Sequence, residues 1–392
     1  MNVNTSLNPI DSLYRNDRKS KKFLTKSDSR YSVLTDEDDD VDQVRKDSKL
    51  KNSKGKIDQQ HIHKGSVDSG VPKYLAKHIN SQISNEIPSL LLTYGKKENW
   101  FVPSADVKIE KKPFAAGSCA QIYRGFFRGI QIVIKQIADR ENQRNVKDIR
   151  REIALWRTLR HPNIVMFLGA SFHPMHGERI LMEYMCSGNL TQKMRNNKLG
   201  LEEALDIAIS IGQAVAYLHG NRPPIIHRDL KPDNIMFGSG GQAKLGDFGL
   251  ARIRASKRMD RGYKMTGRTG TLRYMAPEVL IEPVEYDEKV DVFSLGLITY
   301  FAVTSYQPFM NYSKDEREEF ARRRQNFKVP SSIKIHKELK KFIEDAVLAH
   351  NDLRPKAIDF VYNLQHHAQR QGIRISRARA APRTKHKFCC IS

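Results

Sequence analysis

Residues Ile225–Phe237, with the sequence IIHRDLKPDNIMF, consist of two apolar runs on either side of a polar segment. The polar segment contains Asp229, Lys231 and Asn234. A turn between two buried strands would explain the composition, because Asp, Asn and Pro are common in turns. It would not explain the spacing of the three polar residues, which needs another cause.

Three further polar residues stand at characteristic distances from this segment. Asp247 begins an Asp-Phe-Gly tripeptide ten residues after Phe237, and Lys135 ends an apolar run nearly a hundred residues before Asp229. Glu152 lies between them in a stretch with helical spacing. Each of these features is common by itself. All of them together, in this order, are not expected by chance and indicate one shared site.

In this order the motifs resemble those of the eukaryotic-type protein kinases, and the resemblance covers roughly residues 105–368. It implies an α+β, bilobal protein-kinase-like fold. The N-lobe, residues 105–182, would be rich in β-strands with one helix. The C-lobe, residues 186–368, would be mostly helical.

The resemblance implies a role for each polar residue of the central segment. Asp229 would be the catalytic base, and Lys231 would lie beside the transferred phosphoryl group. Asn234 and Asp247 would bind Mg²⁺, a hard cation that prefers oxygen ligands. In phosphoryl transfer the protein mainly positions the nucleophilic hydroxyl and neutralises charge on the phosphate oxygens. Base, phosphate contact and metal ligand would share one loop because they act at one reaction centre.

Two further pairs follow from the same resemblance. Lys135 would bind the α- and β-phosphates of ATP, and Glu152 from a facing helix would hold that lysine in place. The tetrapeptide MAPE, which ends at Glu278, matches the end of a kinase activation segment. Glu278 would pair with Arg354, and Asp291 would support the catalytic loop from a buried helix.

The type of kinase is indicated by the catalytic loop. Lys231 and Pro232 lie in a D-L-K-P-x-N pattern typical of serine/threonine kinases, and Thr271 in GTLRYMAPE agrees with it. Residues His161–Gly169, HPNIVMFLG, and the preceding Trp100 are most similar to the tyrosine kinase-like group, which includes the Raf and mixed-lineage kinases. Substrates would be proteins. A tyrosine-specific acceptor pocket is the alternative.

The phosphate-binding loop departs from the kinase pattern. The expected G-x-G-x-x-G-x-V is AAGSCAQI at 115–122, so Gly117 alone remains of the three glycines. Glycine lets the backbone approach phosphates and adopt positive φ, and alanine is its least obstructive substitute. We therefore expect weaker or slower nucleotide binding than in relatives. A weakly active, pseudokinase-like scaffold that binds ATP is the alternative, but pseudokinases normally lose Lys135, Asp229 or Asp247.

The residues expected to surround the nucleotide come from the phosphate loop, the sheet and the hinge between the lobes. Met182 would be the gatekeeper behind the adenine pocket, and Glu183, Tyr184 and Met185 would form the hinge. The full predicted set is Phe114, Ala115, Ala116, Gly117, Ser118, Cys119, Ala120, Gln121, Ile122, Val133, Lys135, Met182, Glu183, Met185 and Met236.

The segment 247–278 is long and basic and is predicted to be the activation segment. In related kinases an arginine at the position of Arg228 pairs with a phosphate in this segment and orders it. Thr266 and Thr269 are the predicted phosphorylation sites, followed by Ser256. A basic loop that is merely solvated is the alternative.

Apolar patterns predict several elements of the kinase-like region. The pattern at 130–137 predicts a strand, and those at 142–160 and 201–220 predict helices. Trp156 follows Glu152 by one helical turn and therefore shares its face. We expect Trp156 to fill the core, with a role in holding the helix inward as the alternative.

Composition limits the class of protein. In 392 residues, Lys and Arg exceed Asp and Glu by 67 − 44 = 23. A basic chain suits nucleic acid, an anionic membrane surface or acidic proteins. Four cysteines are too few for a secreted disulfide framework, and no apolar run suits a signal peptide or a membrane span. We therefore expect a cytoplasmic protein in a reducing compartment.

The flanking regions differ from the kinase-like region. Residues 1–70 are rich in Ser, Asn, Lys and Asp and hold little apolar material, which predicts a disordered region. Residues 71–104 form a lead-in whose weak apolar pattern predicts short helices. Residues 369–392 form a basic tail.

The tail ends in Cys389-Cys390-Ile391-Ser392, which fits a C-a-a-X signal for a farnesyl group on Cys389. One lipid chain binds membranes only marginally, so a second signal is needed. Basic residues of the tail would supply it at an anionic cytosolic membrane face: Arg374, Arg377, Arg379, Arg383, Lys385 and Lys387. Dual-cysteine prenylation and a nucleic-acid-binding tail are the alternatives. Because the chain lacks an aromatic-interleaved basic patch outside the tail, we favour membrane tethering over nucleic acid.

Overall fold

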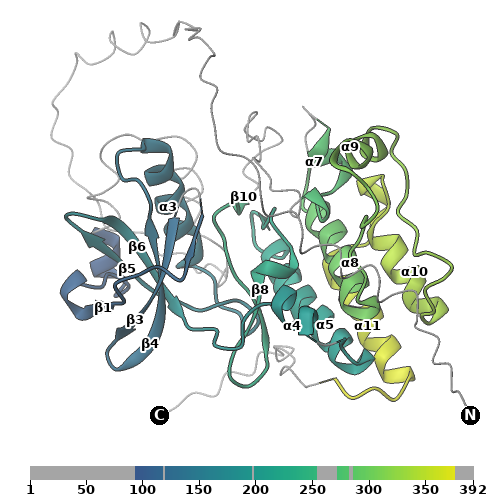
Figure 1. Cartoon of the computed structure of the whole chain (residues 1–392), viewed down its shortest axis with the longest axis horizontal. Coiled ribbons are helices and arrows are strands. Elements are labelled where there is room, and N and C mark those ends of the chain that lie inside the picture. Colours follow the sequence, from purple (N-terminus) through teal and green to yellow (C-terminus); the bar gives the residue numbers. More distant parts are fainter. Residues whose placement is uncertain (1–92, 118–119, 197, 254–271, 282–285, 376–392) are drawn as a thin grey trace, which may run out of the picture. The chain divides into compact units, whose positions relative to one another are not determined.

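The computed structural model describes residues 93–117, 120–196, 198–253, 272–281 and 286–375. Within them an antiparallel sheet with one large helix forms the N-lobe, and a mainly helical C-lobe follows it in the chain (Figure 1). The predicted α+β, bilobal arrangement is confirmed.

The N-lobe sheet has six antiparallel strands. Their order is β1-β3-β4-β6-β5, and β2 pairs with β3. The strand predicted at 130–137 is β4, in the middle of the sheet, where Ile132 and Ile134 are fully buried. The bounds are β1 Val107–Ile109, β2 Ala115–Ala116, β3 Ala120–Phe127, β4 Ile130–Ile137, β5 Phe167–His173 and β6 Gly177–Glu183.

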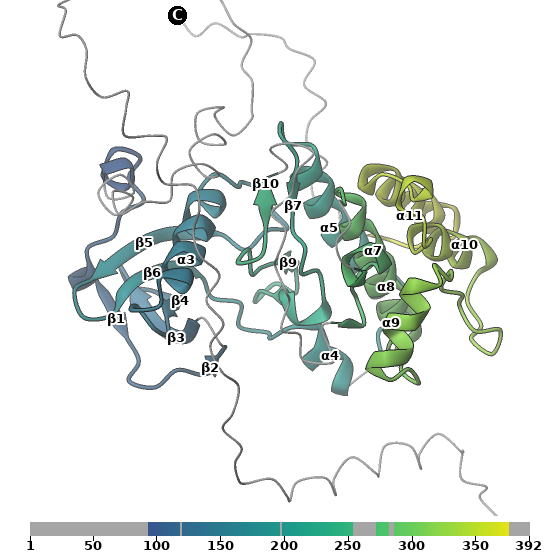
Figure 2. The ribbon, with the colours of Figure 1, turned by 90° about the horizontal axis from the view of Figure 1, so that it is seen from above.

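Helix α3, Gln143–Trp156, packs on the sheet beside β4 and β6 (Figure 2). The side chain of Asn142 begins the helix by accepting hydrogen bonds from the backbone amides of Arg144 and Asn145. The predicted helix at 142–160 is therefore present, but it ends four residues earlier. Its buried face carries Ile149, Ile153 and Trp156 into the main core.

The C-lobe is built around two buried helices. α8 is buried over almost its whole length, which explains why its sequence is apolar on all sides. α5 packs against α8 and α11, as Figure 1 shows. The helix bounds are α4 Leu190–Asn196, α5 Leu201–His219, α7 Pro277–Leu280, α8 Lys289–Thr304, α9 Lys314–Arg322, α10 Lys337–Ala346 and α11 Ala357–Arg370.

Two small strand pairs lie beside the helices. β7, Ile225–Ile226, pairs with β10, Arg252–Ile253, and β8, Ile235–Phe237, pairs with β9, Ala243–Leu245. The sequence segment of the opening motif is thus two short strands joined by a loop and the 3₁₀ turn Pro232–Asn234. The β8–β9 pairing brings Asp247, just after β9, next to that loop.

The described end of the lead-in packs on the N-lobe. Residues 93–97 form a helical turn, and the 3₁₀ turn η2, Ser104–Asp106, precedes β1. The indole of Trp100 donates to Glu98 at 3.0 Å, and the guanidinium of Arg157, just after α3, lies 5.7 Å from the Trp100 ring. The lead-in therefore contacts the end of α3.

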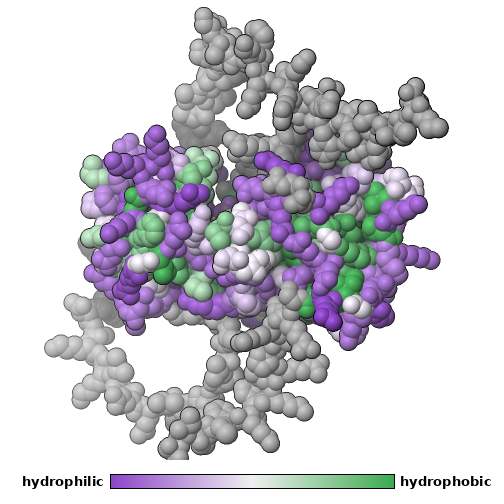
Figure 3. Space-filling model, turned by 60° about the horizontal axis from the view of Figure 1, so that its bottom comes forward, coloured by the Kyte–Doolittle hydropathy of each residue, from purple (hydrophilic) through white to green (hydrophobic). Residues whose placement is uncertain are grey.

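Most of the flanking predictions fall outside the described residues. These are the disordered region 1–70, the lead-in up to residue 92 and the tail with Cys389. Among the described residues no helix is long and apolar enough to cross a membrane. On the face seen in Figure 3, hydrophilic residues cover much of the described surface, with apolar patches between them.

Candidate active site

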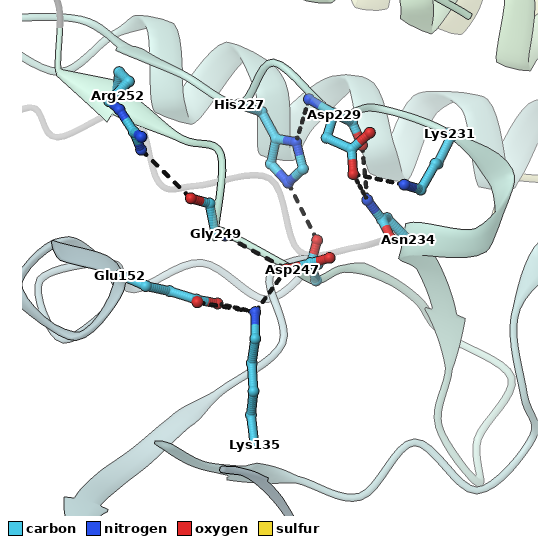
Figure 4. Close-up of polar contacts among 10 residues, drawn as sticks. Lys135, Glu152, His227, Asp229, Lys231, Asn234, Asp247, Gly249 and Arg252 are labelled. Atoms are coloured by element: carbon cyan, nitrogen blue, oxygen red, sulfur yellow. Dashed lines mark hydrogen bonds and ion pairs between the residues drawn. The ribbon is translucent and has the colours of Figure 1, made fainter. Parts of the chain in front are cut away.

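Lys135, Glu152 and Asp247 meet at one point, as Figure 4 shows. Lys135 Nζ lies 2.8 and 2.9 Å from the two carboxylate oxygens of Glu152 and 2.9 Å from Oδ1 of Asp247. The three residues come from β4, from α3 and from the loop after β9. Three separate elements must therefore be in place for these contacts to form.

The charges in this cluster are strongly coupled. Lys135 lowers the pKa of Asp247 below its ordinary value, against the opposite effect of burial. Burial would lower the pKa of Lys135, but Asp247 and Glu152 together raise it above its ordinary value. At neutral pH the lysine is therefore a cation and Asp247 an anion. The Asp247 side chain is still 43 % exposed to solvent.

The catalytic loop brings Asp229, Lys231 and Asn234 together. Lys231 Nζ lies 2.6 Å from Oδ2 of Asp229. The side-chain amide of Asn234 donates to the backbone oxygen of Asp229 at 2.7 Å and to its Oδ2 at 3.0 Å. Asp229 and Asn234 are both buried. The asparagine therefore fixes both the backbone and the carboxylate of the aspartate.

Asp291 on α8 holds this loop from below. Its Oδ2 accepts from the backbone amide of His227 at 2.8 Å and from Nε2 of His219 at 2.9 Å, and its Oδ1 accepts from the amide of Arg228 at 2.9 Å. Burial by itself would raise the pKa of Asp291, but the hydrogen bond and charge of His219, with smaller effects from His227 and the Arg228 amide, lower it overall. The predicted support of the loop by Asp291 is confirmed.

Backbone strain is present at two positions of the site. Arg228 has φ 71° and Asp247 has φ 59°, in the left-handed region that residues other than glycine rarely adopt. Such strain costs of order 1–3 kcal/mol per residue and persists where the surroundings enforce it. At Arg228 the left-handed conformation is held by the hydrogen bonds that its own backbone amide and that of His227 donate to Asp291.

A row of rings connects α3 with the catalytic loop. Phe248 is fully buried, with its ring centroid 5.2 Å from Trp156 and 5.0 Å from His227. The Trp156 indole donates to the backbone oxygen of Val165 at 2.9 Å. Trp156 fills the core as predicted, and it also touches the phenylalanine next to Asp247.

The phosphate loop forms a short hairpin without positive φ at its alanines. Ala115 pairs with Ile122, and Ala116 pairs with Gln121. Among the described residues, the non-glycine positions with positive φ do not include Ala115, Ala116 or Ala120. The strain that the missing glycines could have caused is therefore absent there. Ser118 and Cys119 lie outside the described residues.

The residues predicted to surround adenine are mostly buried. Val133 on β4 pairs in register with Met182 on β6, and both are buried, as is Met185. Ile122 and Met236 are partly buried and pack against the large core cluster that contains these three residues. Their role in binding adenine stays a prediction.

Sequence reasoning missed two contacts near this site. Lys244 on β9 lies 2.7 and 2.8 Å from the carboxylate oxygens of Glu183, and so links the hinge to the strand before Asp247. The guanidinium of Arg124 on β3 lies 5.2 Å from the Phe114 ring and 5.7 Å from the Tyr184 ring. The only sequence signal was β-strand alternation, which puts Arg124 and Ile122 on one face.

The activation segment is described only at its ends. Thr266, Thr269, Thr271 and Ser256 lie outside the described residues. At the far end the guanidinium of Arg354 binds Glu278 through two contacts of 2.6 and 2.8 Å. The predicted pairing of Glu278 with Arg354 is confirmed.

Comparison with known proteins agrees with this geometry. Residues 110–367 match the protein kinase domain family. Serine/threonine-protein kinase VIK of Arabidopsis thaliana is 37 % identical over 230 residues, which cover 56 % of this chain and 51 % of VIK. Serine/threonine-protein kinase CTR1 of the same plant is 35 % identical over 217 residues, covering 54 % of this chain and 25 % of CTR1.

A third similar protein is RasGEF domain-containing serine/threonine-protein kinase X of Dictyostelium discoideum, which is 32 % identical over 210 residues, 53 % of this chain and 21 % of that protein. The matches thus span about half or less of these relatives. The matched region contains every residue of the cluster around Lys135 and Asp229. The chain belongs to the protein kinase domain family.

Proposed function

We propose that the chain is a serine/threonine protein kinase, which transfers the γ-phosphate of ATP to Ser or Thr hydroxyls of protein substrates. The observation on which the proposal rests is that Lys135 contacts both Glu152 and Asp247 beside the loop of Asp229. Its likeness to VIK and CTR1, both named serine/threonine kinases, supports the acceptor class.

Lys135 and the phosphate loop would hold the nucleotide. The ammonium of Lys135 would bind the α- and β-phosphates, with Glu152 fixing its position. Backbone amides of the loop around Gly117 would contact the phosphates from the other side. Positioning of this kind provides most of the catalysis in phosphoryl transfer.

Asp229 would accept a hydrogen bond from the incoming hydroxyl and align it with the γ-phosphate. Lys231, 2.6 Å from this carboxylate, is within reach of the transferred group. Its positive charge would stabilise negative charge on the transferred phosphoryl group in the transition state.

The site also fits Mg²⁺. Because the amide nitrogen of Asn234 is bonded to Asp229, the amide oxygen is the atom that can bind a cation, and the exposed carboxylate of Asp247 can bind it as well. Such oxygen ligands suit Mg²⁺. When bound, the ion neutralises charge on the phosphate oxygens.

An autophosphorylation assay with Mg-ATP tests the proposal. Asp229→Asn should lose phosphoryl transfer while still binding ATP, because the change removes the carboxylate and keeps the size of the side chain. Asp233→Asn, at an exposed position of the same loop, is the matched control and should keep activity. Equal transfer by the Asp229→Asn and wild-type proteins would exclude Asp229 from the mechanism.

The same assay distinguishes the alternative, a pseudokinase-like ATP-binding scaffold. A scaffold would bind Mg-ATP, seen as a rise in the melting temperature, but would transfer no phosphate to itself or to generic protein acceptors. The chain keeps Lys135, Asp229 and Asp247, with Lys135 bound to Asp247 and Lys231 bound to Asp229, and this favours the active enzyme.

We further propose that the tail tethers the kinase to the cytosolic face of a membrane, through a farnesyl group on Cys389 and the basic residues before it. Farnesylated full-length protein should bind vesicles that contain phosphatidylserine, and Cys389→Ser should not be farnesylated or retained. Tighter binding of the tail to RNA than to these vesicles would contradict the proposal.

A further inference from the structure

A cluster of three potential metal ligands lies in the C-lobe, outside the proposed active site. His336 immediately precedes α10, Glu338 lies in its first turn, and His367 lies near the end of α11. One ligand atom from each residue lies within 4.8 Å of the other two. Figure 2 shows α10 and α11 at the end of the C-lobe that is remote from the N-lobe sheet.

The carboxylate of Glu338 is already oriented by two neighbours. His367 Nδ1 lies 2.8 Å from Oε2 of Glu338, and the guanidinium of Arg370 binds the other carboxylate oxygen. The two contacts together fix the orientation of the carboxylate.

The two imidazoles differ in exposure. His367 is fully buried, and its ring centroid lies 4.8 Å from that of His336, which is exposed to solvent. The ring of Phe342 stands edge-on to His367 at 6.4 Å and forms an apolar wall. A site at this point would be closed on the His367 side and open to water on the His336 side.

Packing alone does not explain a histidine at position 367. Its Nε2 is buried and has no hydrogen-bond partner among the described residues. A buried polar atom without a partner is unfavourable. The contact between His367 Nδ1 and Glu338 is therefore the interaction that favours histidine over an apolar residue at this position.

Two imidazoles and one carboxylate form a common three-ligand set for zinc, which leaves a fourth position for water. Bonds of about 2.0–2.2 Å in a tetrahedral site put ligand atoms about 3.3–3.6 Å apart. The contact of 2.8 Å between Glu338 and His367 is shorter than this and would lengthen on binding. His336 accepts from the backbone amide of Glu338 through Nδ1, so it would bind the metal through Nε2. Arg370 would then be the outer group that orients a metal-binding carboxylate.

We propose that His336, Glu338 and His367 bind one divalent transition-metal ion of the zinc type, which links the start of α10 to the end of α11. The competing arrangement is a metal-free network in which His367 and Arg370 both bind Glu338. The two arrangements differ in their response to added metal, because only the first needs His336.

The test uses metal-stripped full-length protein with excess Mg²⁺, which fills weak carboxylate sites. Co²⁺ is titrated in, because tetrahedral Co²⁺ absorbs visible light strongly and is displaced by Zn²⁺. The variants are His336→Gln and Glu338→Gln. The matched control is His366→Gln. His366 is the neighbour of His367 on α11, packs at a tilt against the ring of Tyr362 and lies outside the cluster.

We expect the wild-type and His366→Gln proteins to bind one more equivalent of Co²⁺ than His336→Gln and Glu338→Gln, with the visible absorption lost in these two variants. Zn²⁺ should raise the melting temperature of the first two proteins more than that of the others. Sites elsewhere in the chain contribute equally to all four proteins. Equal stoichiometry and equal spectra for the wild type and His336→Gln would overturn the proposal.

Discussion

The ring of Trp156 on α3 packs against the ring of Phe248, with the two centroids 5.2 Å apart. Phe248 in turn meets His227 of the catalytic loop edge-on. Glu152 lies one helical turn before Trp156, and Asp247 directly precedes Phe248. The apolar contact therefore links α3 to the Asp-Phe-Gly segment, the same two segments that Lys135 links through its ion pairs with Glu152 and Asp247.

Replacing Trp156 by Ala should destabilise the fold by about 3–5 kcal/mol, the usual effect of removing a fully buried aromatic side chain. Kinase activity should fall by more than the decrease in the fraction of folded protein, because α3 loses its contact with Phe248. Trp156→Phe keeps a ring at this position and should retain most of the activity. Urea denaturation and initial rates, measured below the unfolding transition, check both. Full activity of folded Trp156→Ala would show that the contact is only structural.

Breaking the pair of Arg354 and Glu278 should be costly, because the Arg354 side chain is 0 % exposed. Removing one partner of a buried ion pair costs about 3–5 kcal/mol. We expect Glu278→Gln to lower the free energy of unfolding by an amount near this range. Glu319→Gln breaks the exposed pairs with Arg322 and Arg323 and should cost much less, because solvent screens exposed ion pairs. Equal losses in the two variants, measured by denaturant titration, would contradict this account.

Stability should fall as the pH drops through the titration of His161. Burial lowers the pKa of His161 to about 4, so the unfolded chain, near pKa 6.5, binds a proton more readily than the folded protein. The folded state is therefore favoured above pH 6.5 and loses this contribution between about pH 6.5 and 4. One proton contributes at most about 1.4 kcal/mol per pH unit.

His161→Asn should reduce this pH dependence. In the wild type, the backbone amide of Asn163 donates to His161 Nδ1 at 3.1 Å. Asparagine does not titrate, and its side-chain oxygen can accept the same hydrogen bond. His350→Gln, at an exposed position, should leave the dependence unchanged. The check is the free energy of unfolding at several pH values, and identical slopes for wild type and His161→Asn would remove His161 as the cause.

Restoring glycines in the phosphate loop should not accelerate the enzyme. Ala115 and Ala120 sit in the hairpin without positive φ, so glycine at these positions relieves no strain. Ala120→Gly should instead lose about 0.5–1 kcal/mol of stability, because glycine is more flexible in the unfolded chain. Steady-state kinetics with varied ATP provides the measurement. A several-fold rise in kcat/KM for ATP in either variant would show that the alanines do limit nucleotide binding.

Gly117→Ala gives the contrasting case. Among the described residues, the nearest contact of a Cβ at Gly117 would be the backbone oxygen of Ala120 at 3.8 Å, so the fold should tolerate it. If the loop contacts phosphates as proposed, the added methyl group should raise the KM for ATP without lowering the melting temperature. An unchanged KM would place the nucleotide farther from Gly117.

The sequence predicted the parts of the site that depend on motif spacing. Asp229, Asn234 and Asp247 were found from order and distance along the chain, and Lys135 from the apolar run that it ends. The pair of Lys244 and Glu183 was not found, because it depends on how β9 meets the hinge in space. For the same reason the place of Arg124 between Phe114 and Tyr184 was missed.

The phosphate loop shows the limit of pattern reasoning in a different way. Missing glycines suggested a strained loop, since the family pattern marks three positions as glycine. Whether such a position requires positive φ is set by the local hairpin register, and Ala115 opposite Ile122 leaves the backbone in ordinary extended geometry. Weaker nucleotide binding, which the missing glycines suggested, is untested by this geometry, and the kinetics described above will decide it.

Asp291 reaches the catalytic loop through main-chain amides rather than through side chains. An anchor of that kind does not depend on which residues occupy positions 227 and 228, apart from the left-handed backbone required at Arg228. Substitutions of the side chains at these two positions can therefore change the chemistry of the loop, while Asp291 on α8 still holds its backbone in the same conformation.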